Sequence, residues 1–316
     1  MKFAGIIAEY DPFHNGHAWQ LAQAKALGAE RVAVAMSCSL VQRGALPLLP
    51  EAVRTRSALT CGADLVFALP APCACAGAEA FARAGVALLA AAGCDGLVFG
   101  AETPDAALLM EAAELLDSGS YRAALKAQLA GGARSFAAAR QAAAAQLASD
   151  ERVAALLDKP NNNLAVEYCR AIRSLAPRME AYPLPRQGAN HGEALHSAHG
   201  QFASASALRK LWAEGGADAI APYVPEAVFP LYQEAYAAGQ YTDFSAAGRC
   251  ELALLRSACR GKAPFADIRG VSEGLEHRLE AAVRTSTTYD ELLDALTTVR
   301  YPRARMRRLA MDAALG

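Results

Sequence analysis

The sequence predicts an α/β fold, with a doubly wound, largely parallel sheet followed by a mostly α-helical C-terminal region. Short apolar runs alternate with helical patterns over the first hundred residues, which is typical of parallel strands buried on both faces. Beyond Ala213 the chain has no further good strand pattern. We therefore expect a sheet domain over residues 1–215 and a helical region over 216–316, with a linker at Pro222 and Pro225.

Five strands are expected, and the first is the clearest. Its residues are apolar and uncharged, and Asp11-Pro12 ends it, because proline cannot continue a hydrogen-bonded ladder. The expected strands are Phe3–Ala8, Arg31–Ser37, Ala63–Pro70, Asp95–Glu102 and Met179–Leu184. The helices expected among them are Ala18–Leu27, Glu51–Cys61, Ala76–Ala92 and Leu164–Leu175.

Residues 105–158 form an alanine-rich stretch that we expect to be helical, because alanine is the best helix former. Breaks are expected near Gly119 and at Gly131-Gly132, and the helices should pack over the sheet. The segment Lys159–Asn163 is expected to be a turn, in which an asparagine can cap the following helix.

Composition limits the class of protein. The chain has 316 residues, 31 basic and 32 acidic side chains and a net charge of −1, so any contact with nucleic acid must come from a local patch. No run of eighteen apolar residues occurs, and a membrane span is not expected. Met1-Lys2 precedes the first strand directly and leaves no room for a cleavable signal, so we expect a cytoplasmic protein.

Metal binding is weakly indicated. The eight cysteines lack the spacing of a metal site, although Cys73 and Cys75 are close. His191, His196 and His199 are loosely spaced with one carboxylate near them, and we expect no metal there.

The turn after the first strand carries the strongest functional signal. His14-Asn15-Gly16-His17 opens a helix, and unpaired backbone N–H groups at such a helix start attract anions. Two histidines three residues apart lie on one helical face, where both can donate to a phosphate chain. The alternative is that both histidines only cap the helix, but the position at the end of the first strand favours a phosphate site.

Two further segments can bind anions. Serines followed by Arg209 open a helix in Phe202–Arg209, which is a second helix start with a cation one turn in. Near the C-terminus one predicted helix carries an arginine run around Tyr301, which can meet RNA phosphates or be only a solvated face. The run comprises Arg300, Arg303, Arg305, Arg307 and Arg308, with Arg300, Arg303 and Arg307 expected along one face.

The chain resembles the HxGH nucleotidyltransferase superfamily and, over nearly its whole length, the bacterial tRNA(Met) cytidine acetate ligase family. The matching segments are Ile7–His17, Val41–Gly44, Gly62–Val66, Phe99–Glu102, Pro160–Asn162 and Ala203–Arg209. The resemblance implies a sheet domain of the HxGH nucleotidyltransferase type. It also implies that ATP, expected with Mg²⁺, activates acetate as acetyl-adenylate, which then acetylates N4 of the wobble cytidine of elongator tRNA(Met). No protein partner is inferred.

The resemblance also implies site residues. His14 and His17 would be catalytic, and Arg300, Arg303 and Arg307 are our RNA-binding candidates. The residues expected to bind ATP are Ile7, Ala8, Glu9, Tyr10, Asp11, Pro12, Phe13, His14, Asn15, Gly16, His17, Ala18, Trp19, Gln20, Gly100, Asn161 or Asn162, Arg186, Ser204 and Arg209.

The chain departs from the family pattern at several positions. Asp11 stands where the family usually has asparagine, and Cys38 and Leu40 replace glycine and phenylalanine in a loop that could shape the acetate pocket. Two other functions remain open: a small-molecule adenylyltransferase of the same superfamily, and a non-catalytic nucleotide- or RNA-binding protein.

Overall fold

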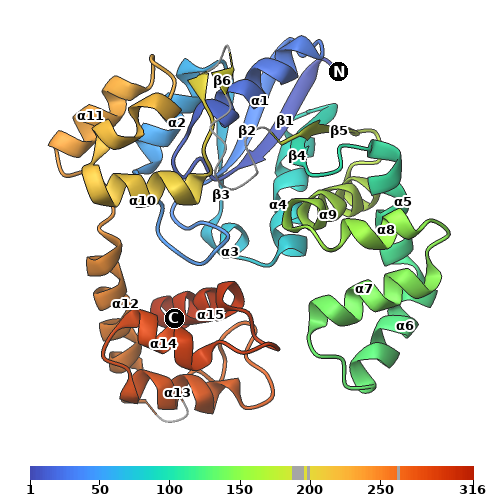
Figure 1. Cartoon of the computed structure of the whole chain (residues 1–316), viewed down its shortest axis with the longest axis vertical. Coiled ribbons are helices and arrows are strands. Elements are labelled where there is room, and N and C mark those ends of the chain that lie inside the picture. Colours follow the sequence, from blue (N-terminus) through green and yellow to red (C-terminus); the bar gives the residue numbers. More distant parts are fainter. Residues whose placement is uncertain (187–195, 198–199, 262–263) are drawn as a thin grey trace.

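A computed structural model of the chain describes residues 1–186, 196–197, 200–261 and 264–316. Its centre is an all-parallel sheet of five strands in the order β3-β2-β1-β4-β5 (Figure 1). The strands are β1 Phe3–Ala8, β2 Arg31–Ser37, β3 Leu65–Leu69, β4 Gly96–Ala101 and β5 Glu180–Pro185. All five strands predicted from apolar runs are confirmed, with β3 and β4 shorter at their ends than expected.

Helices cover both faces of this sheet (Figure 1). The helices of the first 215 residues are α1 Asn15–Ala26, α2 Glu51–Thr60, α3 Ala71–Ala74, α4 Ala78–Ala91, α5 Ala106–Asp117, α6 Gly119–Ala130, α7 Phe136–Leu147, α8 Glu151–Leu156, α9 Pro160–Leu175 and α10 Ala205–Gly215. Two short antiparallel strands, β6 His196–Ser197 and β7 Gly200–Gln201, and the one-turn helix α3 had no signal in the sequence.

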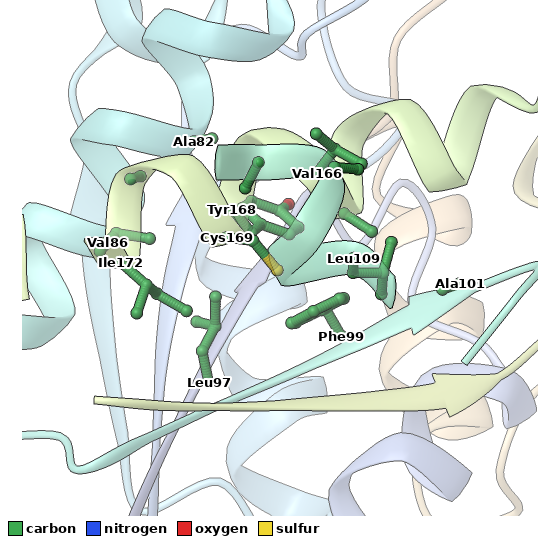
Figure 2. Close-up of a cluster of buried hydrophobic side chains, with 14 of the residues drawn as sticks. Ala82, Val86, Leu97, Phe99, Ala101, Leu109, Val166, Tyr168, Cys169 and Ile172 are labelled. Atoms are coloured by element: carbon green, nitrogen blue, oxygen red, sulfur yellow. The ribbon is translucent and has the colours of Figure 1, made fainter. Parts of the chain in front are cut away.

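Each strand contributes side chains to two apolar clusters, because alternate side chains point to opposite faces of the sheet. In β2, Ala33 and Ala35 join the cluster beneath α4, α5 and α9, whereas Val32 and Val34 join the cluster beneath α1, α2 and α10. Figure 2 shows the first cluster, where side chains of β4 face the helices that cover them. The sheet is therefore buried on both faces, as its apolar runs predict.

The alanine-rich stretch is helical and breaks where predicted, but only part of it covers the sheet. Helix α5 packs on α9 and reaches β5, whereas α6 and α7 pack on each other and on α5. In Figure 1 these two helices form a lobe below α8 and α9, away from the sheet. The expectation that the whole of residues 105–158 packs over the sheet is therefore wrong for α6 and α7.

The predicted turn at Lys159–Asn163 is wrong. Helix α9 begins at Pro160, with Lys159 as its N-cap, so the asparagines lie in the first helical turn and do not cap it. Proline favours this position because its fixed φ fits the first helical turn and it lacks the N–H that would be unpaired there.

The predicted linker is also wrong. Pro222 lies inside the 3₁₀ helix η1 Ala217–Tyr223, and η1 and α11 Phe229–Ala237 pack into the core of the sheet domain through Ile220 and Tyr232. We therefore propose that the domain boundary lies near Gln240 rather than at residue 215.

The remaining helices build a separate core. They are α12 Phe244–Ala258, α13 Leu275–Thr285, α14 Tyr289–Leu296 and α15 Arg303–Leu315. Helix α15 begins only at Arg303, so Arg300 precedes the helix and cannot share a helical face with Arg303 and Arg307. Among the described residues, no helix combines the length and hydropathy that a membrane span requires.

Candidate active site

A cavity of about 340 Å³ opens where β1, β4 and β5 end. Ligands dock at this edge of open parallel sheets because the strands diverge there and helix N-termini point into the gap. Thirteen of the twenty residues expected to bind ATP line it: Ile7, Ala8, Glu9, Tyr10, Asp11, His14, Gly16, His17, Trp19, Gln20, Gly100, Asn161 and Arg186. The other seven lie outside its lining: Pro12, Phe13, Asn15, Ala18, Asn162, Ser204 and Arg209.

The two histidines both cap α1 and line the cavity. His14 is the N-cap, and its Nδ1 accepts a hydrogen bond from the Gly16 N–H at 3.0 Å. The Nδ1 of His17 accepts from the His14 N–H at 3.2 Å, and the two rings stack with centroids 3.7 Å apart. Because each Nδ1 is an acceptor, the proton of each neutral ring belongs on Nε2. The capping and phosphate-binding interpretations are therefore compatible.

Both rings are neutral near physiological pH. Burial, with the Arg186 and Arg209 guanidinium groups, lowers the pKa of His14 to about 3. Burial and the neighbouring His14 lower the pKa of His17 well below its usual value. The pair therefore offers the cavity two neutral N–H donors, not two positive charges.

We expect acid to destabilise the fold through this pair. Below pH 6.5 the two histidines bind protons in the unfolded chain but not in the folded one. Their contribution to folding stability is therefore complete above about pH 6.5 and is lost as the pH falls toward 3. The slope is at most ~1.4 kcal/mol per pH unit for each ring, and less here because both rings are partly exposed. The melting temperature of the wild type should therefore approach that of the double variant His14→Asn/His17→Asn as the pH is lowered from 7 to 5.

The matched control is His277→Asn, because His277 lies exposed on α13. It replaces a histidine that does not line the cavity. Parallel curves for the wild type and the double variant would contradict the assignment of neutral rings.

A hydrogen-bonded group of side chains also contributes to the cavity wall through Arg186 and Asn161. Arg186 Nη1 donates to Asn161 Oδ1 at 2.6 Å, and Asn161 Nδ2 donates to Glu102 Oε1 at 2.6 Å. Asn162 is buried, accepts from the Thr103 N–H at 2.9 Å and donates its own N–H to Glu102. The structure therefore separates the two asparagines: Asn161 faces the cavity, and Asn162 joins α9 to the end of β4.

Glu102 was missed as an organising residue. Its carboxylate accepts from the backbone N–H groups of Asn161 and Asn162, where a negative charge is favoured by the helix dipole. The signal in the sequence was an acidic residue at the end of the fourth strand together with three successive asparagines.

Asp11 separates the cavity from a second one. The carboxylate is buried, accepts from the Leu48 N–H at 2.5 Å and forms ion pairs with Arg43 at 2.5 Å and Arg209 at 3.3 Å. Arg209 also donates to the Asp11 carbonyl at 2.6 Å and lines the second cavity. Ser204 caps α10 as predicted, and Ala205 of that first turn lines the first cavity.

The substituted loop does not line the cavity. Cys38 is buried and its thiol lies 3.2 Å from the Met36 carbonyl, whereas Leu40 packs against Cys75 and Met311. Neither residue is among those that line the first cavity. The expectation that these two changes shape an acetate pocket therefore lacks support from their positions.

Arg54 is the second residue that was missed. It is fully buried, and its guanidinium donates to the carbonyls of Leu49 at 2.9 Å, Glu9 at 2.7 Å, Ser37 at 2.6 Å and Cys38. This set ties the ends of β1 and β2 to the loop between β2 and α2.

The metal hypothesis has no support in the described part of the chain. No group of three or more histidine, cysteine or acidic side chains there could hold a metal ion. His191 and His199 lie outside the described residues.

Comparison with known proteins shows the family to which the chain belongs. The family model described as HIGH Nucleotidyl Transferase matches residues 1–316. The chain is 36% identical to the tRNA(Met) cytidine acetate ligase of Syntrophotalea carbinolica, over 98% of this chain and 73% of that protein. It is 33% identical to the ligase of the same name from Acetivibrio thermocellus, over 100% of this chain and 77% of that protein.

Solved structures show the same fold. Thermotoga maritima TmcAL without ligand matches with a TM-score of 0.90 at 30% identity, over 99% of this chain and 75% of that one. The same protein bound with alpha-thio ATP matches with a TM-score of 0.89 at 29% identity, over 99% and 74%. The chain belongs to the tRNA(Met) cytidine acetate ligase family of HIGH nucleotidyl transferases.

Proposed function

We propose that this protein uses ATP to activate acetate as acetyl-adenylate and then acetylates N4 of the wobble cytidine of elongator tRNA(Met). The observation that carries the proposal is the cavity lined by His14, His17 and Arg186 in a chain 36% identical to a ligase of that name. The ATP analogue bound to a relative of the same fold supports ATP as the nucleotide.

The first step needs geometry and charge neutralisation more than it needs a base. An acetate oxygen attacks the α-phosphorus of ATP, the bond to the β-phosphate oxygen breaks, and pyrophosphate leaves with the electron pair. In-line positioning and donors aimed at the phosphate oxygens lower such a barrier. The Nε2–H groups of His14 and His17 supply neutral donors, and Arg186, which lines the same cavity, supplies a positive charge.

The second step moves the acetyl group. The exocyclic N4 amine attacks the acetyl carbonyl, AMP leaves, and N4 loses a proton. Glu9 lines the cavity, and burial raises the pKa of its carboxyl group, although Arg43 acts in the opposite direction. A carboxylate with a raised pKa is suited to accept that proton.

The lining does not form a dedicated metal site. Its carboxylates, Glu9 and Asp11, already accept backbone N–H groups, and Asp11 is paired with arginines. A magnesium ion that accompanies ATP would be held by the nucleotide's phosphates and by water. We infer a cytoplasmic enzyme because its proposed substrates, ATP and tRNA, are found there.

Acetate-dependent exchange of pyrophosphate into ATP tests the proposal. We expect exchange with acetate and none with phosphopantetheine or nicotinamide mononucleotide, because the group that accepts the adenylyl moiety in the proposed first step is a carboxylate. Exchange driven by either cofactor precursor would identify a small-molecule adenylyltransferase instead. No exchange with any of the three would favour a non-catalytic binding protein.

A further inference from the structure

A second cavity, of about 750 Å³, lies between the sheet domain and the C-terminal helices. The loop after β2, the first half of α10, the N-terminal half of α12, the start of α14 and Arg307 of α15 line it. The segment Gln42–Arg43 joins the two cavities, because Gln42 lines the first and Arg43 lines the second.

The lining carries a surplus of positive charge. It holds five cationic side chains, Arg43, Arg209, Lys210, Arg249 and Arg307, and two carboxylates, Glu251 and Asp290. Asp290 is itself paired with Arg303 at 2.7 Å, outside the lining. Arg43 and Arg209 are both paired with the single carboxylate of Asp11, which lines the first cavity. The charges that face the cavity are therefore incompletely neutralised by the described residues.

The arginines also repel one another. Burial, with Arg43 and Arg307, lowers the pKa of Arg209 to about 10, against the opposing effects of Asp11 and Glu9. A like-charge cluster held in a partly buried cavity is relieved when an anion enters, because the same groups then become charge-assisted donors.

The fold holds Arg307 rigidly beside this cluster. Helix α15 sits directly on the loop after β2: a Cβ at Gly44 would lie 2.6 Å from the Arg308 nitrogen. Arg308 Nη1 also donates to the Gln42 carbonyl at 3.2 Å. Close backbone contact of this kind needs a glycine, and here it fixes α15 against the loop that carries Arg43.

The other arginines of the C-terminal run are engaged elsewhere. Arg300 pairs with Glu273 at 2.7 Å, and Arg303 pairs with both Asp290 and Asp294. Arg305 stacks over Tyr301 at 5.0 Å from the ring centroid. Of the three arginines expected to meet RNA, only Arg307 lines the cavity.

We infer that the second cavity binds a phosphodiester of the RNA acceptor through Arg43, Arg209 and Arg307. The inference rests on the proposed function, which places the reacting base in the first cavity. When a base of an RNA enters the first cavity, the backbone next to that base lies near the segment Gln42–Arg43 that the two cavities share. A cationic cavity beside this segment is better suited to bind that backbone than to bind a second small anion.

The test is the salt dependence of tRNA binding by Arg307→Gln, measured at low salt with elongator tRNA(Met) and an unrelated tRNA. Loss of one phosphate contact should reduce the slope of log K against log salt by about one unit and weaken binding of both tRNAs. Arg307→Lys should restore the slope, because phosphate accepts a point charge. The control, Arg303→Gln, should keep the wild-type slope because its charge is already paired.

Acetate-dependent pyrophosphate exchange shows whether the second cavity binds RNA or the triphosphate of ATP. Exchange by Arg307→Gln should equal that of the wild type if the cavity serves RNA alone. A raised KM for ATP with an unchanged salt slope would overturn the inference and assign the cavity to the triphosphate. A slope equal to that of Arg303→Gln would also overturn it. Absence of exchange in the wild type would instead refute the proposed function and leave the binding result interpretable.

Discussion

His17→Asn is expected to lower acetate-dependent pyrophosphate exchange by at least about 100-fold, the usual cost of one lost donor at a developing negative charge. The asparagine Oδ1 occupies the place of Nδ1, so it keeps the acceptor for the His14 N–H and preserves the cap. It lacks a donor at the position of Nε2. The variant should therefore show a large fall in the rate of pyrophosphate exchange and only a small fall in the melting temperature measured without ATP.

The matched variant is His17→Gln, whose longer amide can place an N–H near the position of Nε2. We expect it to retain part of the activity that His17→Asn loses. All three variants lose the ring contacts of His17 to Tyr10 at 4.8 Å and Phe13 at 5.6 Å, but alanine would be a poorer choice because it also removes the acceptor for the His14 N–H. Equal activities of the asparagine and glutamine variants, with equally lowered melting temperatures, would make the residue structural.

Much of the fold could be predicted because its signals are local. A buried parallel strand reads as an uncharged apolar run, and all five strands were found in this way. The errors involve context. The sequence predicts a break at Pro160 and at Pro222. In the structure Pro160 opens a helix, and Pro222 lies in a 3₁₀ helix whose apolar residues join the core of the sheet domain.

The candidate site was predictable only where one segment supplies it. The run from Ile7 to Gln20 contributes nearly half of the lining, but Arg209 lines the neighbouring cavity, where it pairs with Asp11. Likewise, Arg300 and Arg303 looked free in the sequence, whereas their carboxylate partners lie 27 and 13 residues away along the chain. Such pairings depend on tertiary packing, which periodicity does not encode.

Arg54→Lys is expected to cost on the order of 3 kcal/mol of folding stability, because a buried polar network loses its donors. Arg54 satisfies four backbone carbonyls from one planar fork, whereas lysine has three donors on a single atom and cannot reach all four. For a chain of this size we expect the melting temperature to fall by on the order of 5–10 °C. ATP binding should weaken as well, because the Glu9 carbonyl belongs to the segment that lines the first cavity, where we propose that ATP binds.

Arg56→Lys is the control for this prediction, since it is the same change one half-turn along α2. Arg56 is 61% exposed and meets Glu234 only at 4.0 Å, and exposed pairs of this kind contribute little. Its variant should melt within about 1 °C of the wild type. Equal melting temperatures for the two lysine variants would contradict the role given to Arg54. A fall confined to Arg54→Lys would show that this buried guanidinium stabilises the fold by joining the ends of β1 and β2 through their backbone carbonyls.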